Sequence, residues 1–204
     1  MQVHNFAQRT QDWWDIRRGV PTASRFDAIL TPKTAKPSAS QEGYICELIA
    51  ERFAAQWPPM ETPILSHAMA YGVENEPRAR AWYGFATDHD VREVGFCMAD
   101  DGRFGCSPDG LIGEVGCLEL KCPQPATHIR YLLDGGLPSE YRCQVHGQLI
   151  VTGCEWNDFV SFCDGFPALR IRVCRDEFTE ALEAEIMRFC DKYESAIQKI
   201  KAMR

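Results

Sequence analysis

Residues 106–122 read CSPDGLIGEVGCLELKC, and this stretch decides the fold. Short apolar segments broken by Gly and Asp are typical of strands. They predict one strand over about 103–112 and a second over about 117–122, with Gly113-Glu-Val-Gly116 as the turn between them. The stretch therefore predicts an antiparallel hairpin.

This hairpin brings acidic and basic side chains together. Side chains two residues apart on a strand share a face, so Glu119 and Lys121 project together while Leu118 and Leu120 face the core. Folding the hairpin back brings Asp109 toward Glu119. Two carboxylates that close repel each other unless a cation lies between them, and such hard oxygen ligands suit Mg²⁺ or Mn²⁺. An adjacent lysine can orient or deprotonate a metal-bound water, as hydrolysis of a phosphodiester requires.

The same residues also fit a surface hairpin without chemistry. Pro-Asp-Gly alone is a common turn, and Glu-x-Lys alone is a common same-face pair. Both motifs together, with Asp109 ten residues before Glu119 and on the inferred strand faces, favour the metal site.

Apolar periodicity predicts the remaining helices and strands. A short aromatic lead-in precedes a helix that begins at Thr22 or Ser24, and Trp57-Pro-Pro59 ends the next one. The later helices are expected at about 41–56, 66–86 with a bend or boundary at Pro77, 138–152 and 177–202. Further strands are expected around 91–96, 156–163 and 169–174.

The last helix carries apolar residues at steps of three or four, which predicts one buried stripe. The stripe consists of Phe178, Leu182, Ile186, Phe189, Tyr193, Ile197 and Ile200. The order of elements predicts a single α/β domain over residues 1–204, built around a mixed β-sheet flanked by helices.

Composition limits the class of protein. The chain has 204 residues, of which 45% are hydrophobic and 25% charged, as is ordinary for a globular domain. No apolar run approaches the ~18 residues that a membrane span needs. No apolar segment at the N-terminus resembles a signal peptide, so we expect a cytoplasmic protein without membrane contact.

The formal net charge of −7, from 22 Lys+Arg against 29 Asp+Glu, argues against a protein that coats DNA through bulk positive charge. Any role on nucleic acid must then depend on a local positive groove, on bound cations or on topology. Two divalent ions would add +4 and leave −3, so a carboxylate-held metal site would remove much of the excess.

The ten cysteines show no Cys-x-x-Cys pair and no zinc-knuckle spacing. Without a secretory signal, reduced thiols are expected. Most lie in apolar segments, where a thiol behaves as a small hydrophobe. The spacing also argues against an iron–sulfur cluster.

A resemblance to a known family adds to this interpretation. Asp109 with Glu119-x-Lys121 matches the signature of the PD-(D/E)XK nucleases, and the wider pattern resembles the phage lambda-type exonucleases, the YqaJ-like viral recombinases. The resemblance covers about residues 9–155 and implies a restriction-endonuclease-like core. Its five matching blocks lie within 9–24, 71–80, 106–110, 116–123 and 141–148.

The resemblance implies a metal site. Asp109 matches the aspartate that bridges the metal ions, Glu119 and the backbone carbonyl of Leu120 match further ligands, and Lys121 matches the catalytic lysine. A helix glutamate four residues after Gly72 matches another ligand, and by this spacing it is Glu76. Its competitor is Glu74, since residues two apart on a helix point about 200° apart and only one can reach the site.

The resemblance also implies a pocket for a terminal 5′-phosphate. Arg17 and Ser24 match its anchor, because Arg offers a rigid fork of donors and Ser a hydroxyl beside a helix start. Ser107 and Gln144 complete the pocket, with Arg18 as the competitor of Arg17.

Other polar and aromatic residues have a structural alternative. Tyr141 either lines the site or packs in the core. Trp13 and Trp14 are expected to pack the N-terminal segment rather than stack on a base. His146 lies on a different helix face from Gln144, and a lysine-based site does not need it as a base. Met69 is a candidate for a strand-separating wedge, but a core position is the preferred interpretation.

The resemblance implies a Mg²⁺-dependent 5′→3′ exonuclease on double-stranded DNA, with two Mg²⁺ ions per site and Mn²⁺ as a possible substitute. It would degrade the 5′-phosphorylated strand and leave 3′ single-stranded DNA for phage-type recombination. A ring-shaped homotrimer around DNA, a single-strand annealing recombinase as partner and a phage or prophage gene in a bacterial host are implied as well.

Two alternatives use the same core. One is a DNA endonuclease, either a restriction enzyme or a junction resolvase, which does not need the pocket of Arg17 and Ser24. The other is a non-catalytic DNA-binding module, against which the presence of Asp109, Glu119 and Lys121 argues.

Overall fold

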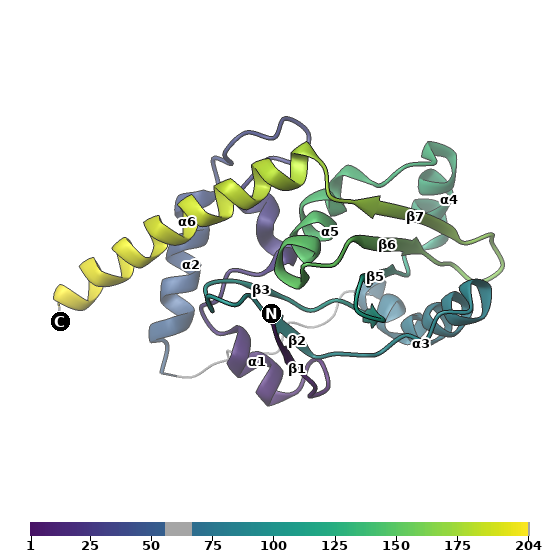
Figure 1. Cartoon of the computed structure of the whole chain (residues 1–204), viewed down its shortest axis with the longest axis horizontal. Coiled ribbons are helices and arrows are strands. Elements are labelled where there is room, and N and C mark those ends of the chain that lie inside the picture. The colour runs from purple at the N-terminus through teal and green to yellow at the C-terminus, as the bar shows by residue number, and fades with distance from the viewer. Residues whose placement is uncertain (56–66, 204) are drawn as a thin grey trace.

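A computed structural model describes residues 1–55 and 67–203. Its main sheet has four strands in the order β4-β5-β6-β7. The central pair, β5 and β6, is parallel, and both outer pairs are antiparallel, so the sheet is mixed as predicted (Figure 1). Its strands are β4 (Gly110–Ile112), β5 (Gly116–Lys121), β6 (Trp156–Ser161) and β7 (Leu169–Cys174).

A second, smaller sheet was not predicted. It has three antiparallel strands, β1 (Gln2–His4), β2 (Phe96–Met98) and β3 (Gly105–Cys106). The strand expected over 103–112 is therefore wrong as one element, since β3 pairs with β2 and β4 pairs with β5. The physical reason lies at Pro108, which has no N–H for a ladder bond and separates the two pieces.

The two faces of β5 have the predicted alternation. Leu118 and Leu120 pack with Ala79 and Tyr83 of α3 (His67–Thr87) in one apolar cluster. Residues of the opposite face point toward α5 (Ser139–Thr152), which crosses over from β5 to β6. Helix α3 continues through Pro77, so the boundary expected there is not seen.

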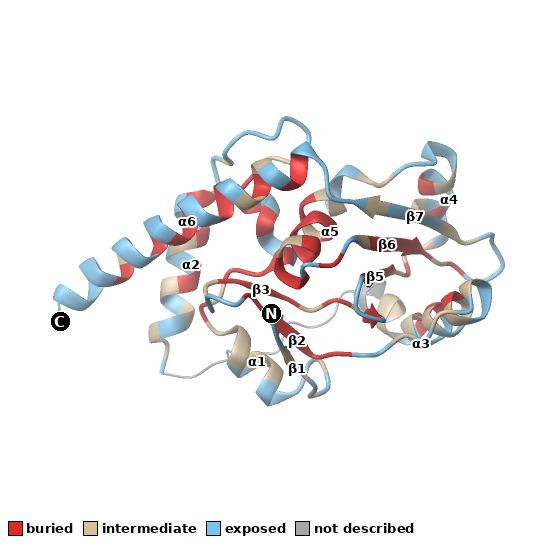
Figure 2. Cartoon of the chain, in the orientation of Figure 1, coloured by how far each residue is buried: buried red, intermediate tan, exposed pale blue. Residues whose placement is uncertain are grey.

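Helix α6 (Glu177–Ala202) and α2 (Gln41–Phe53) cover the larger core. The predicted stripe of α6 is buried from Phe178 to Ile197. Ile200 was wrongly placed in it, because the last turns of α6 extend past the body of the molecule, where they are exposed (Figures 1 and 2). In the described part of the chain, no helix has the length and apolar character needed to cross a membrane.

The N-terminal region and the segment after β5 differ from expectation. The aromatic lead-in is itself a helix, α1 (Gln11–Arg17), and a 3₁₀ helix, η1 (Ala23–Ala28), follows it with Thr22 rather than Ser24 at its N-cap. Helix α4 (Pro125–Asp134) was not predicted. All ten cysteines are free thiols, and only Cys46 and Cys174 are exposed.

Close packing between α5 and η1 fixes the relative position of two parts of the site. At Gly147 of α5 the helix meets the buried ring of Phe26 in η1, and a Cβ there would lie 2.5 Å from Phe26 Cδ2. Ala23 is the next neighbour, at 3.1 Å. Only glycine lets the two helices approach this closely, and that approach sets η1 beside the polar face of α5.

We expect Gly147→Ala to destabilise the protein by about 1–3 kcal/mol, because the Phe26 ring must shift in a filled core. Gly43→Ala is the matched control, since Gly43 also lies in a helix but nothing is within 4 Å of an added Cβ. That change should be neutral or stabilise by up to about 1 kcal/mol. Urea unfolding measures both, and equal effects of the two substitutions would contradict the packing argument.

Candidate active site

One cavity of about 740 Å³ gathers the residues that the sequence singled out. It lies between α3, α5, η1 and the end of β5. All ten predicted site positions line it, although they come from six separate segments of the chain. They are Arg17, Ser24, Glu76, Ser107, Asp109, Glu119, Leu120, Lys121, Tyr141 and Gln144.

Asp109 and Glu119 face each other across the start of the hairpin. Gly110 pairs with Leu118, so Asp109, one residue earlier, is opposite Glu119. The backbone N–H of Asp109 donates to the Leu118 carbonyl at 3.0 Å. Its own Oδ2 accepts the Leu120 N–H at 2.6 Å. The carboxylate is thus fixed to the strand that carries Glu119, as the hairpin predicted.

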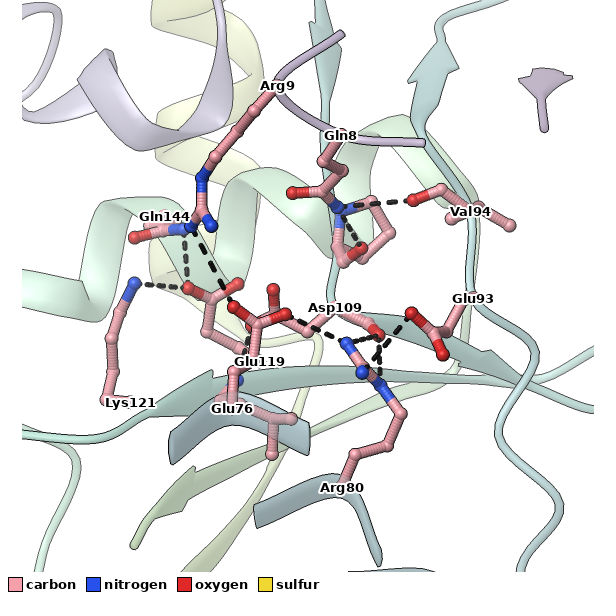
Figure 3. A network of polar contacts seen from close by, with 12 residues as sticks. Gln8, Arg9, Glu76, Arg80, Glu93, Val94, Asp109, Glu119, Lys121 and Gln144 are labelled. Atoms are coloured by element: carbon pink, nitrogen blue, oxygen red, sulfur yellow. Dashed lines mark hydrogen bonds and ion pairs between the residues drawn. The ribbon is translucent and has the colours of Figure 1, made fainter. Parts of the chain in front are cut away.

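Glu119 is buried, with 1% of its surface exposed, and three side chains donate to it. Gln144 Nε2 lies 2.6 Å and Lys121 Nζ 2.5 Å from the same oxygen, Oε1 (Figure 3). Gln148 Nε2 donates to Oε2. The resemblance places Gln144 in the phosphate pocket, whereas in the structure it donates to Glu119.

Gln148 was missed by sequence reasoning. It lies one helical turn after Gln144, on the same face of α5, and that spacing is the signal that would have found it. Its amide oxygen accepts from Asn157 Nδ2 at 2.6 Å, which fixes the direction of its Nε2 donor toward Glu119. A buried polar chain thus runs from β6 through α5 to the carboxylate.

The electrostatics of the site favour added positive charge. Burial raises the pKa of Asp109 well above its usual range, and the negative charges of Glu119 and Glu76 raise it further. Burial by itself lowers the pKa of Lys121, but the charges of Glu119 and Asp109 outweigh that effect and raise it. Lys121 therefore holds its proton in this arrangement.

Glu76 reaches the cavity and Glu74 does not. Glu76 is half-buried and lines the cavity, while Glu74 is exposed on the surface of α3. Arg80 Nη2 binds Glu76 Oε1 at 2.9 Å, and Arg9 Nη2 lies 3.9 Å from Oε2 (Figure 3). These two arginines, which sequence reasoning also missed, turn Glu76 into part of an ion-pair network.

The acidic residues fit a hard divalent cation by their chemistry. Glu76, Asp109 and Glu119 point toward one another (Figure 3), and burial together with the negative charges of Glu119 and Glu76 raises the pKa of Asp109. Within residues 1–55 and 67–203, no three His, Cys, Asp or Glu side chains are arranged as they stand to hold one ion. In this arrangement Arg80 binds the Glu76 carboxylate, and Gln144, Gln148 and Lys121 bind the Glu119 carboxylate.

The other end of the cavity is basic. Arg17 donates to Ser107 Oγ at 3.3 Å and to Thr22 Oγ1 at 3.4 Å, and Ser24 Oγ lies 3.4 Å from the same threonine oxygen. The guanidinium carbon lies 4.2 Å from the ring centre of Trp13, whose indole N–H donates to Ser107 at 2.9 Å. Burial lowers the pKa of Arg17 to about 10.

No carboxylate within the described residues forms an ion pair with Arg17. Its direct neighbours are hydroxyls and aromatic rings, and the carboxylate that acts on its charge, Glu51, does so without a direct ion pair. A half-buried guanidinium of this kind, next to the hydroxyls of Ser107 and Ser24, is suited to an anion. Trp13 acts by packing this arginine, in line with the structural role expected for it.

The competing candidates have structural roles. Arg18 does not line the cavity; it donates to the backbone carbonyls of Glu51, at 2.8 Å, and of Ala54. His146 is buried against Thr179, its ring nitrogen 2.7 Å from the hydroxyl, and burial lowers its pKa. Neither is placed to touch a substrate in the cavity.

Tyr141 satisfies both expectations for it. Its ring stacks on buried Phe159, with centres 5.3 Å apart, while Lys121 Nζ lies 4.9 Å from the centre of the same ring. It therefore packs in the core and also forms a wall of the cavity. The side chain of Met69 lies outside the described part of the chain, as does the helix stop at Trp57-Pro-Pro59.

The sequence matches the YqaJ-like viral recombinase domain over residues 12–155. The chain belongs to this family. The match confirms the resemblance read from the motifs, which span nearly the same residues. No curated protein matches the sequence at a significant level.

Solved structures support the assignment to the YqaJ-like family. The crystal structure of an alkaline exonuclease from Laribacter hongkongensis is 36% identical, with a TM-score of 0.83 over 95% of this chain and 97% of that one. The same exonuclease in complex with dAMP is also 36% identical, with a TM-score of 0.82 and the same coverage. The expected restriction-endonuclease-like α/β fold is thereby confirmed.

A more distant structure shares the fold alone. A phage-related exonuclease from Haemophilus somnus 129PT is 12% identical, with a TM-score of 0.68 over 91% of this chain and 96% of that one. At this identity the likeness concerns the backbone architecture, and it carries no statement about the residues of the site.

We expect Asp109→Asn to stabilise the metal-free protein at about pH 8. Because the folded pKa of Asp109 lies above its unfolded value, its contribution to stability is complete below about pH 4 and is lost as the pH rises through the folded pKa. Asn keeps an acceptor for the Leu120 N–H and removes the repulsion. Thermal unfolding with a chelator present measures the gain.

The pH dependence is the control within that experiment. The advantage of Asp109→Asn should shrink as the pH falls and vanish below about pH 4, where the wild-type carboxyl is protonated in both states. A gain that stays constant across this range, or a loss at about pH 8, would contradict the charge argument.

Proposed function

We propose that the protein is a Mg²⁺-dependent 5′→3′ exonuclease that degrades the 5′-phosphorylated strand of double-stranded DNA. One observation carries the proposal: a single cavity joins an acidic end with a lysine to a basic end whose arginine, Arg17, forms no ion pair within the described residues. The first end suits phosphodiester hydrolysis, and the second suits a terminal phosphate. Family membership and 36% identity to an alkaline exonuclease support DNA exonuclease activity.

In the acidic end, two Mg²⁺ ions would be held by Glu76, Asp109, Glu119 and the Leu120 carbonyl. Mn²⁺ would be able to substitute for Mg²⁺. The metal supplies an activated water and stabilises the leaving oxygen. Lys121, already charged and bound to Glu119, offers a proton donor and a fixed positive charge toward the scissile phosphate. Gln144 and Gln148 keep Glu119 in its orientation.

In the basic end, Arg17 with the hydroxyls of Ser107 and Ser24 would bind the 5′-phosphate. Charged hydrogen bonds of this kind are shorter and stronger than neutral ones. A terminal phosphate held at a set distance from the carboxylates puts the first phosphodiester bond of the strand in the acidic end. Direction then follows from which end of a strand carries a phosphate.

The net charge of −7 fits this function if topology keeps the protein on DNA. A ring-shaped homotrimer that encloses the duplex would do so without bulk positive charge. In phage-type recombination the 3′ single strand would pass to a single-strand annealing recombinase, which makes such a protein the expected partner.

The test is digestion of strand-labelled DNA with Mg²⁺ or with a chelator. A linear duplex with 5′-phosphates should be degraded from its 5′ ends, a 5′-hydroxyl duplex far more slowly, and a closed circle not at all. Equal cutting of all three substrates would favour the endonuclease alternative. Release of nucleotides from the 3′ ends would refute the polarity.

Arg17→Gln should remove the preference for a 5′-phosphate. Hydrogen bonds to charged groups are worth about 1.5–3 kcal/mol, so the ratio of rates on 5′-phosphate and 5′-hydroxyl duplexes should fall about 10–100-fold. Arg25→Ala is the matched control, since Arg25 follows in η1 but pairs with Glu47 at the surface, 2.8 Å away. A preference that survives Arg17→Gln would exclude Arg17 as the anchor.

Lys121→Ala should lower turnover by at least about 100-fold while the protein remains folded. The substitution removes the ammonium that the acidic end holds in place. Circular dichroism and the melting temperature report folding, and initial rates on the 5′-phosphate duplex report turnover. Wild-type turnover in this variant would refute the assignment of Lys121 and support a different catalytic group.

A further inference from the structure

Arg80 connects three parts of the site that are distant in the sequence. Its Nη2 binds Glu76 Oε1 at 2.9 Å, one helical turn back on α3. Both Nε and Nη2 donate to the backbone carbonyl of Asp109 at 3.3 Å. Its Nη1 lies 3.2 Å from Glu93 Oε2 (Figure 3). Every nitrogen of the guanidinium is used within the protein.

This full use separates Arg80 from Arg9, the other arginine on the same carboxylate. The side chain of Arg80 is 17% exposed, while that of Arg9 is 51% exposed and lies 3.9 Å from Glu76. Arg9 is therefore an exposed charge near the site. Arg80 is a fixed link between a metal-site side chain and the peptide of a metal-site aspartate.

The local sequence explains why Glu76 needs such a link. Glu76 precedes Pro77, and a residue before proline is pushed away from regular helical geometry. The proline also has no N–H, so one bond of the α3 ladder is missing at this turn. The ladder of α3 is therefore one bond short directly after Glu76, and Arg80 binds the Glu76 carboxylate from the next turn.

The loop that carries Asp109 is held from the other side as well. Gln8 Nε2 donates to the Pro108 carbonyl at 3.1 Å and to the Val94 carbonyl at 3.2 Å. Two successive carbonyls, of Pro108 and Asp109, are thus each bound by a side chain from elsewhere. Of the two side chains, Gln8 and Arg80, only Arg80 also binds a second acidic residue of the site, Glu76.

We propose that Arg80 is a positioning residue, which sets the Glu76 carboxylate against Asp109 so that both can bind one divalent cation. The inference rests on the proposed function, because the cation is the Mg²⁺ of that site. The fork of Arg fits this role because it holds a carboxylate and a carbonyl at fixed angles, whereas lysine is a point charge. Arg80 itself need not touch the DNA.

The test is calorimetric titration of the DNA-free protein with Mn²⁺ and with Mg²⁺. Loss of a group that orients a metal ligand typically weakens metal affinity about 10–100-fold, and we expect that loss for Arg80→Gln. Arg80→Lys, which keeps the charge without the fork, should lie between it and wild type. The melting temperature of each variant in chelator reports folding.

Two control variants separate positioning from general stability. Arg78→Gln lies on the same helix but removes a surface pair with Asp164, 2.8 Å apart, and should leave metal affinity unchanged. Glu93 is the outer partner of Arg80, and its side chain is 69% exposed. Glu93→Gln should therefore change metal affinity less than Arg80→Gln does.

A double-mutant cycle tests whether Arg80 acts through Glu76. If it does, Arg80→Gln should weaken metal binding much less in a Glu76→Gln background than in wild type. Additive losses would overturn the inference. In activity assays, the Mg²⁺ concentration for half-maximal rate should rise for Arg80→Gln, while KM for DNA stays the same.

The outcomes separate this inference from the proposed function. An Arg80→Gln protein that binds metal as wild type does, next to a wild type that degrades 5′-phosphorylated duplex, overturns the inference alone. A wild type that neither binds Mg²⁺ nor digests DNA overturns both. If Arg80→Gln does not fold, Arg80→Lys carries the comparison, and wild-type affinity in that variant counts against the fork.

Discussion

The repulsion between three neighbouring carboxylates, one of them buried, is the constraint on which the rest of the site depends. Asp109 and Glu119 are set opposite each other by strand register, and Glu76 adds a third negative charge. Left alone, such a group would protonate or move apart. The surrounding elements supply donors instead: β5 brings Lys121, α5 brings Gln144 and Gln148, and α3 brings Arg80.

Separation of charge within one cavity follows from the same fold. The carboxylates belong to the end of β5 and to α3, while Arg17 lies at the end of α1, where its neighbours are hydroxyls and rings. The close approach of α5 to η1 at Gly147 keeps the two ends a fixed distance apart. A protein of net charge −7 thereby retains, at one end of a cavity, a half-buried arginine without an ion-pair partner among the described residues.

Local patterns predicted much of this structure, and long-range pairing accounts for what they missed. Strand alternation placed Glu119 and Lys121 correctly, and spacing in α3 chose Glu76 over Glu74. The split of 103–112 between two sheets depends on which strands pair, which no local pattern contains. Arg80 contacts Asp109 across 29 residues, so its role is visible only in the fold. Helix α4 was an avoidable miss, because Pro125 at its start and left-handed Gly135 at its end are standard signals.

The fold and the site differ in what they say about function. A relative with 12% identity keeps the backbone at a TM-score of 0.68, so the architecture persists when few residues are shared. Architecture alone therefore does not select a chemistry. What favours one here is the polar network: Gln144 and Gln148 of α5 and Lys121 of β5 hold Glu119, Arg80 of α3 holds Glu76, and Asn157 of β6 fixes Gln148 in turn. A surface hairpin does not need donors of this kind around its carboxylates. The presence of these donors is the strongest physical argument that the acidic residues perform chemistry.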